Sequence, residues 1–249
     1  MKSDRNYENP QHFWEYAGKV GYNNVIFSNS VVANHIVEKQ NIAALNMAEK
    51  LGLNEKSRIL ELGCGDGEFA EYVLSPRFQH IDAYDQSASA IEQARSRLKP
   101  DNIQYHVSDL TLHDFKQGSQ WDGAFCIAFL HHVKAFTPSI VARLAKVAPK
   151  VVVLEPNGDN IIRKGLERLP SHKSAGEDSF RLQELIHIFK ENRYQPVDIR
   201  KITFVPSMCP QPLFPLFKKL EKIVEGSSLL NRLCATYVIG FQQKASNPE

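Results

Sequence analysis

The chain has 249 residues, of which 43% are hydrophobic and 10% aromatic, and its 30 basic residues nearly balance 28 acidic ones. Moderate, balanced charge with many aromatic residues excludes a largely disordered chain. The formal net charge of +2 lacks the basic excess expected of a nucleic-acid-binding domain. The longest purely apolar runs, such as residues 151–154, are far shorter than the roughly 18 residues that a membrane-spanning helix needs.

The termini and the cysteines predict the compartment. The first residues are polar, so we expect no secretory signal. Cys64, Cys126, Cys209 and Cys234 lie far apart and match neither a disulfide framework nor a metal-ligand spacing. We therefore expect a cytoplasmic protein with reduced thiols.

The first half of the chain alternates between two hydrophobic periods. Apolar residues at helical spacing predict a long helix over residues 30–51, closed by Gly52. After it, short apolar runs alternate with helical stretches, the pattern of βαβ units around a parallel sheet. The expected strands are residues 58–62, 80–84, 103–107, 123–127 and 151–154, and the expected helices between them are residues 68–74, 88–98 and 138–147.

The second half has fewer elements and longer insertions. The expected elements are a helix over residues 182–191, a strand over 197–205, an irregular proline-rich stretch over 207–215, an amphipathic helix that ends at Val224, and a strand over 236–242. Together the two halves predict an α/β fold with a Rossmann-like, doubly wound, mostly parallel seven-stranded sheet and helices on both faces. We expect a single domain over residues 1–249, with an N-terminal helical arm (1–55), a ligand-binding core (56–155) and a C-terminal half (156–249) that carries lid insertions at 156–178 and 207–230.

The most informative stretch is the glycine loop within RILELGCGDGEFA, residues 58–70. A predicted buried strand carries Glu61 near its end, Gly63, Gly65 and Gly67 follow at alternate positions, and a helix begins behind them. Glycines allow a positive φ and a close approach of backbone to a ligand. Open α/β sheets bind ligands at this carboxyl edge.

Two ligand classes compete for this loop. A dinucleotide site has the form G-x-G-x-x-G, but the third position counted from Gly63 is Glu68, an anion beside the expected pyrophosphate. Counted from Gly65, a G-x-G-x-x-A match ends at Ala70, two residues late relative to the strand. Glu61 at the strand tip favours a ligand with positive charge over one with phosphates.

The sequence resembles the class I S-adenosylmethionine-dependent methyltransferases. Their first motif, acidic-x-G-x-G-x-G, is matched by Glu61, Gly63, Gly65 and Gly67. Three later stretches resemble the family's next strands in order: IDAYDQS (81–87), HVSDL (106–110) and WDGAFCIAFLHHV (121–133). The resemblance covers residues 56–155 and implies S-adenosylmethionine as cofactor; LEPNG (154–158) resembles small-molecule methyltransferases more loosely.

The resemblance also implies roles for single residues. Asp85 takes the position that binds both ribose hydroxyls, and Asp109 takes the position that contacts adenine. The expected cofactor-binding residues are Glu61, Gly63, Cys64, Gly65, Gly67, Asp85, Gln86, Asp109, Leu110 and Tyr22. Simpler roles stay open: a cap or turn acid for Asp85 and Asp109, an exposed strand-end charge for Glu61, and plain packing for Leu110. Cys64 is assigned no chemistry.

Methyl transfer requires alignment of nucleophile, methyl and sulfur, and an oxygen nucleophile also requires a general base. His131 and His132 follow the fourth strand and are the predicted catalytic residues, because histidine titrates near neutral pH. The alternative is that they begin a helix or pack beside the adenosine. The expected substrate-binding residues are Tyr16, Glu155, Asn157 and His172. No metal site is expected.

Two peripheral segments have two interpretations each. Tyr16 and Tyr22 either close over the cationic sulfonium or anchor the arm to the core. In the helix over residues 213–224, apolar residues lie on one side, and Lys218, Glu221 and further charged residues lie on the other. Packing over the substrate pocket is the expected role of the apolar side, and peripheral membrane contact or entry of an apolar substrate is the alternative.

We therefore expect a methyltransferase of a small molecule such as a sugar, a polyketide or a lipid precursor. An RNA or protein methyltransferase is less favoured, because residues 128–131 (AFLH) lack the Asn/Asp-Pro-Pro-aromatic motif of base methylation and the charge is near neutral. A non-catalytic cofactor-binding protein and, less favoured still, an NAD-linked dehydrogenase are further alternatives. The expected partners are a small-molecule substrate and no nucleic acid, without stable membrane insertion, in a monomer or homodimer.

Overall fold

The computed structural model describes residues 30–97, 100–115, 120–160 and 178–244. Its elements, in chain order, are α3 (Ser30–Lys50), β1 (Arg58–Leu62), η1 (Ala70–Leu74), β2 (His80–Asp85), α4 (Ala88–Ser96), β3 (Ile103–Val107), β4 (Gly123–Ile127), η2 (Leu130–Phe136), α5 (Thr137–Leu144), β5 (Lys150–Pro156), α8 (Leu182–Glu191), β6 (Tyr194–Ile202), η3 (Gln211–Leu213), α9 (Phe214–Gly226), η4 (Leu230–Leu233) and β7 (Thr236–Gln243). No helix among these elements is both long and apolar enough to cross a membrane.

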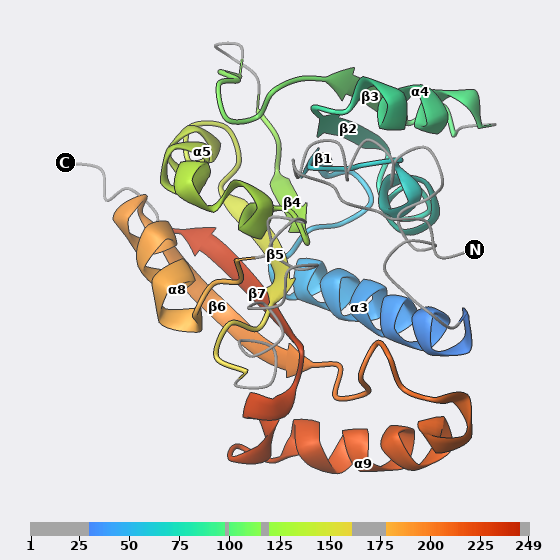
Figure 1. Ribbon diagram of the computed structural model, residues 1–249. Helices are drawn as coiled ribbons and strands as arrows, with labels where there is room; N and C mark the ends of the chain where they lie inside the picture. The colour runs from blue at the N-terminus through green and yellow to red at the C-terminus, as the bar shows by residue number, and fades with distance from the viewer. Residues whose placement is uncertain (1–29, 98–99, 116–119, 161–177, 245–249) are drawn as a thin grey trace.

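All seven strands belong to one sheet, in the order β3-β2-β1-β4-β5-β7-β6 (Figure 1). Strands β1 to β5 pair in parallel, and β7 pairs antiparallel with both β5 and β6. The predicted mostly parallel seven-stranded sheet is confirmed. The strand order reverses at β1 and β4, so their carboxyl ends form the crevice where such sheets bind ligands.

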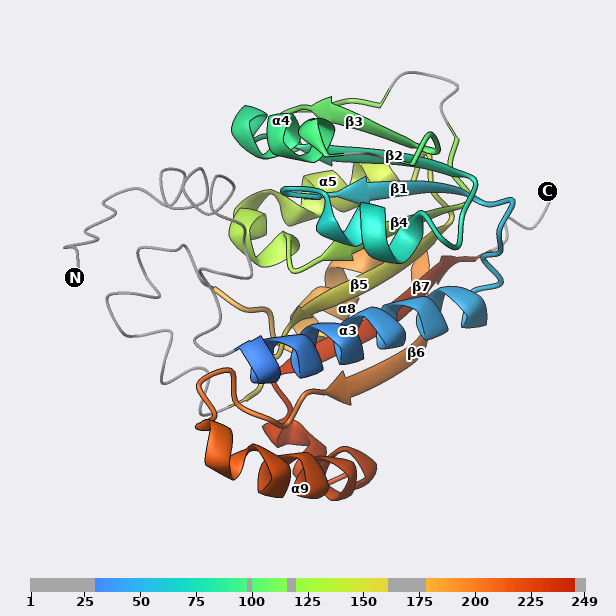
Figure 2. The same cartoon turned by 90° about the vertical axis from the view of Figure 1, so that its right-hand side faces the viewer.

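The strands bury both of their faces. Leu60 and Leu62 of β1 join the hydrophobic cluster that includes residues of α5 and α8, whereas Ile59 joins the cluster that includes α3, η1 and α4. This alternation follows from the two-residue period of a strand. Helices therefore cover both faces, as predicted; in Figure 2, α3 crosses the sheet in front of β5 and β7, and α8 lies behind them.

Strand β6 starts and ends three residues before the predicted 197–205. Tyr194 and Gln195 already pair with β7, and the register shifts between Pro196 and Asp198 because proline has no N–H for the ladder. The strand ends before Thr203, whose φ is +64° and whose N–H donates to Glu225 Oε1 instead of extending the ladder.

The expectation of an irregular stretch over 207–215 is wrong at its C-terminal end. Residues Gln211–Leu213 form a 3-10 turn, and α9 begins at Phe214. Pro215 lies in the first turn of α9, where its missing N–H would have no intrahelical partner.

The expected orientation of α9 is also wrong. Sequence spacing placed Glu221 on the outer side and the apolar residues against the protein. Instead Glu221 is 2% exposed, whereas Leu213, Leu216 and Ile223 are 47%, 55% and 64% exposed. Polar contacts of Glu221 with distant parts of the chain set this rotation.

Candidate functional site

The glycine loop after β1 is held close to two neighbouring loops. Gly63 and Cys64 donate their backbone N–H groups to Tyr84 O at 2.8 and 3.0 Å. Gly63 has a φ of +73°, and a Cβ there would lie 2.3 Å from Cδ2 of Phe129, which follows β4. Only glycine fits this position, so the sequence lets the loops after β1 and β4 meet at the crevice.

A second glycine, Gly67, lets the loop approach the side chain of Tyr105 on β3. Gly67 has a φ of +77°, and a Cβ there would lie 2.6 Å from the hydroxyl of Tyr105. The Tyr105 hydroxyl donates to Gly67 O at 3.3 Å. The helix behind the loop ends in the π-helical turn η1, in which Ser75 N donates to Ala70 O.

Glu61 is the buried acid of this site. It is 2% exposed, and its Oε2 atom has no hydrogen-bond partner among the described residues. Burial, together with the nearby carboxyls of Asp85 and Asp66, raises the pKa of Glu61 to about 8. An unpaired buried carboxylate is costly, and a cation bound beside it would remove that cost.

Asp85 joins the loops after β1 and β2. Its Oδ2 accepts the N–H of Gly65 at 2.8 Å, and its Oδ1 accepts the N–H of Ser87 at 2.8 Å. Burial raises the pKa of Asp85, although these backbone N–H groups act in the opposite direction. Gln86, the next residue, is exposed. The structure thus gives Asp85 the turn-capping role that the sequence left open, at the position expected for the ribose contact.

Asp66 was missed by the sequence analysis. It lies between two glycines of the loop, is 4% exposed, and contributes to the raised pKa of Glu61. Its place inside the motif was the available signal. With Glu61 and Asp85 it makes the site acidic, which suits a cationic ligand and opposes a pyrophosphate, so the dinucleotide alternative loses support.

The predicted catalytic pair lies in the first turn of the 3-10 helix η2, which follows β4, so the two histidines do begin a helix, as the alternative interpretation expected. His131 is 4% exposed, and its Nδ1 lies 2.7 Å from Oε2 of Glu155, which is fully buried on β5. The other oxygen of Glu155 accepts the N–H groups of Phe129 and Leu130 at 3.0 and 2.7 Å. The rings of His131 and His132 lie side by side, with centroids 3.8 Å apart.

The comparisons with known proteins agree with this geometry. Residues 59–150 match the family model described as a methyltransferase domain. No curated protein sequence matches the chain.

The N-methyltransferase NodS from Bradyrhizobium japonicum WM9, solved with S-adenosyl-L-homocysteine, is similar in fold: TM-score 0.63, 15% identity, 96% of this chain and 100% of that one covered. Magnesium protoporphyrin IX methyltransferase from Synechocystis PCC 6803 has a TM-score of 0.60 at 12% identity, covering 95% of this chain and 100% of that one. The cyclase SpnF has a TM-score of 0.65 at 14% identity, covering 95% of both chains.

Residues 59–150 of this chain therefore form a methyltransferase domain. The match covers β1 to the start of β5, and therefore includes the glycine loop, Asp85 and the His131 turn.

Three other predicted cofactor residues of this methyltransferase have structural roles. Asp109 is exposed, and its Oδ1 accepts the N–H and the hydroxyl hydrogen of Thr111 at 2.9 and 2.6 Å, which caps a turn. Leu110 packs in a core cluster. Cys64 is buried, and burial raises the pKa of its thiol well above the usual value. Cofactor contact by these residues stays a prediction.

Of the four predicted substrate-binding residues, the structure describes only Glu155 and Asn157. Asn157 is fully buried and donates to Cys234 O at 2.7 Å, so it fixes the loop after β5. Tyr16, Tyr22 and His172 lie outside the described residues. Direct substrate contact by any of them, and by Glu155, stays a prediction.

Two other features of the methyltransferase lie away from this site. A cavity of about 720 Å³, lined by Leu53, Asn54 and Phe78 among others, lies at the amino edge of the sheet and does not include the glycine loop. Within the described ranges, no three His, Cys, Asp or Glu side chains are placed to hold a metal ion. That no metal takes part in the reaction stays a prediction.

Proposed function

We propose that this methyltransferase binds S-adenosylmethionine at the carboxyl ends of β1 and β4 and transfers its methyl group to a small-molecule acceptor. The observation that carries the proposal is Glu61, a buried carboxylate whose Oε2 has no partner among the described residues. S-adenosylmethionine carries an ammonium and a sulfonium, and either positive charge would stabilise the ionised form of Glu61. When bound, it supplies the reactive methyl group on sulfur.

The glycine loop and Asp85 would bind the rest of the cofactor. The positive φ values at Gly63, Gly65 and Gly67 leave the backbone free of Cβ atoms where it faces the crevice. Asp85 already orders Gly65 through a hydrogen bond, so this carboxylate positions the loop as well as facing the ribose site. Gln86 and Asp109 remain proposed contacts.

For an acceptor with a hydroxyl group, we assign the general base to His131. Its Nδ1 faces Glu155, so Nε2 is the atom that would take the acceptor proton while the acceptor oxygen bonds the methyl carbon and the carbon–sulfur bond breaks. Glu155 is a positioning residue, because its carboxylate contacts His131 and two backbone amides. His132 is the second candidate base, beside it.

A small-molecule acceptor is supported by the neighbours and by charge. The porphyrin methyltransferase acts on a small molecule by its name. The net charge of +2 offers little attraction for RNA. The cyclase among the neighbours carries a different reaction on a similar fold, so the methyl-transfer proposal rests on Glu61 and the glycine loop rather than on the fold.

The proposal is tested by transfer of an isotopically labelled methyl group. The protein is incubated with labelled S-adenosylmethionine and fractionated small-molecule, lipid, RNA and protein pools, and labelled products are identified by mass spectrometry. We expect label in a small-molecule or lipid-precursor fraction, strongly reduced in His131→Asn and unchanged in Gly226→Ala. Label only in RNA or protein would contradict the acceptor class, and cofactor binding without transfer would support the non-catalytic alternative.

A further inference from the structure

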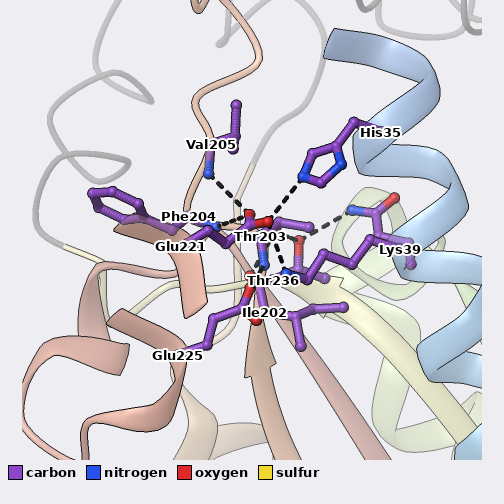
Figure 3. A network of polar contacts seen from close by, with 10 residues as sticks. His35, Lys39, Ile202, Thr203, Phe204, Val205, Glu221, Glu225 and Thr236 are labelled. Carbon is purple, nitrogen blue, oxygen red and sulfur yellow. Dashed lines mark hydrogen bonds and ion pairs between the residues drawn. The ribbon is translucent and has the colours of Figure 1, made fainter. Parts of the chain in front are cut away.

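A buried carboxylate of α9, Glu221, joins this helix to α3 and to the loop after β6 (Figure 3). Oε1 of Glu221 accepts the N–H groups of Phe204 and Val205 at 2.9 and 3.2 Å. Oε2 of Glu221 lies 2.8 Å from both His35 Nε2 and Lys39 Nζ of α3. Burial alone would raise the pKa of Glu221, but the hydrogen bonds from Lys39 and His35 outweigh it and lower this pKa. The carboxylate is therefore ionised and fully bonded on the inner side of α9.

A second carboxylate, one turn later, fixes the same rotation. Glu225 Oε1 lies 2.7 Å from Lys39 Nζ and accepts the N–H of Thr203 at 2.8 Å. Thr203 has a φ of +64°, which a β-branched residue rarely adopts. The loop after β6 is thus shaped to point its amides at α9, and both acidic residues of the helix face inward.

This rotation leaves a stripe of large apolar side chains outside. Leu216, Leu220 and Ile223 follow the spacing of one helix face and are 55%, 39% and 64% exposed. Only Val224 is a buried apolar residue of α9, and Phe217 packs on the small cluster formed with α3. The stripe has no partner among the described residues.

The turns on either side extend the stripe. Seven of the fourteen exposed large hydrophobic residues in the described part of the chain lie between positions 208 and 230. We call six of them the α9 patch: Leu213, Leu216, Leu220, Ile223, Leu229 and Leu230. They lie on α9, on η3, and on η4 with its N-cap Leu229, and both short helices contact α9. A patch of this kind marks an interaction surface rather than scattered surface residues.

The charges around the α9 patch have one sign. Lys218, Lys219 and Lys222 are exposed on α9, and Arg232 is exposed on η4. The two acidic residues of α9 are turned inward and paired, so they do not cancel these charges locally. Exposed leucines flanked by lysines match a surface of apolar chains under anionic headgroups.

We propose that the α9 patch docks the protein on a membrane surface that contains anionic lipids, with α9 lying in the plane of the interface. The helix has 13 residues, about 20 Å, which suits an interfacial helix and is too short to span. Strand β6, which leads into α9, runs parallel to β1, so α9 and the glycine loop lie at the same edge of the sheet. Docking brings this carboxyl edge to the lipid surface, a role beyond the proposed methyl transfer.

Vesicle sedimentation with the full chain tests the proposal. The probes are vesicles of phosphatidylcholine alone and of phosphatidylcholine mixed with phosphatidylglycerol. We expect binding to the mixed vesicles that weakens with salt, and at least a tenfold loss in the double variant Leu216→Asp, Ile223→Asp. Replacing Lys218, Lys219 and Lys222 with Gln should weaken binding by roughly a hundredfold at low salt. Leu112→Asp is the matched control, because Leu112 is 77% exposed and lies outside the patch.

Four results would overturn the proposal. The first is that the protein binds both vesicle types equally or binds neither. The second is that the double variant Leu216→Asp, Ile223→Asp binds the mixed vesicles as tightly as the wild type. A third is a wild-type dimer in light scattering that Leu216→Asp dissociates, since the occupant would then be a second copy of the chain. The fourth is that the double variant Leu216→Asp, Ile223→Asp has a lower melting temperature than the wild type, whereas Leu112→Asp does not. The apolar stripe would then pack against other parts of the same chain.

Discussion

The Nδ1 atom of His131 lies 2.7 Å from the Oε2 atom of Glu155, and both side chains are buried at the carboxyl edge of the sheet. Burial raises the pKa of Glu155 to about 7, although the backbone N–H groups that donate to its carboxylate lower this pKa. Near neutral pH the pair therefore changes its proton count. This arrangement of a histidine oriented by a carboxylate is the one that general-base catalysis requires.

Replacing His131 tests the assigned base. Asn keeps an amide hydrogen near the position of Nδ1, facing Glu155, but has no atom equivalent to Nε2. We expect His131→Asn to lower kcat for a hydroxyl acceptor by about 10²–10⁴-fold, with cofactor affinity changed by less than about twofold. Steady-state kinetics and calorimetry measure the two quantities. If His131→Asn and His132→Asn both keep wild-type turnover, the general-base proposal is wrong.

The pH dependence of turnover follows from the same pair. Below the raised pKa of Glu155, about 7, the carboxyl is protonated and no longer stabilises a protonated His131. We expect kcat for a hydroxyl acceptor to rise with pH through about 7. In Glu155→Gln this rise should shift or disappear. A flat profile in the wild type, with chemistry shown to be rate-limiting, would contradict the role of the pair.

Glu61→Gln should stabilise the protein when no cofactor is present. The pKa of Glu61 in the folded protein is about 8, above the usual 4.5, so folding favours the protonated form. The contribution of Glu61 to the free energy of unfolding is therefore fully present below about pH 4.5 and is lost as pH rises through about 8. At pH 9 we expect the variant to have a higher melting temperature than the wild type, with a free energy of unfolding that is larger by a few kcal/mol at most. Near pH 5 the two proteins should differ little. A melting temperature below that of the wild type at high pH would mean that Glu61 has a stabilising partner.

Gly63→Ala should disrupt the site more than a neutral glycine substitution. Its φ of +73° and the 2.3 Å approach of a Cβ to Phe129 require backbone strain or movement of the ring. We expect a loss of about 1–3 kcal/mol in the free energy of unfolding and weaker cofactor binding. Gly226→Ala is the control, since nothing lies within 4 Å of its Cβ position, and it should be neutral or slightly stabilising. Equal effects of the two substitutions in denaturant melts would contradict this account of the loop.

Much of the sheet could be predicted because local sequence determines it. β1, β3 and β4 have the predicted bounds, since each is a short apolar run that ends at turn residues. The glycine loop was equally visible, because each of its glycines adopts the positive φ that other residues avoid.

The errors came from interactions between distant parts of the chain. The rotation of α9 depends on Glu221 meeting His35 and Lys39, which are 186 and 182 positions earlier, and no helical period reveals that pairing. The end of β6 depends on Thr203 donating to Glu225. In the candidate site, Glu155 could be singled out from its place at the end of a predicted strand, but its contact with His131 could not, because the two residues come from different strand ends.

The central claim is that Glu61 and the glycine loop bind S-adenosylmethionine, and isothermal titration calorimetry tests it most directly. We predict one site in the wild type, with affinity that rises between about pH 6 and about pH 7.5, because Glu61 ionises increasingly in this range while the ammonium of the cofactor stays largely protonated. We also predict at least about tenfold weaker and nearly pH-independent binding in Glu61→Gln, and no binding of NAD. Absence of S-adenosylmethionine binding, NAD binding in its place, or wild-type affinity in Glu61→Gln would contradict the claim.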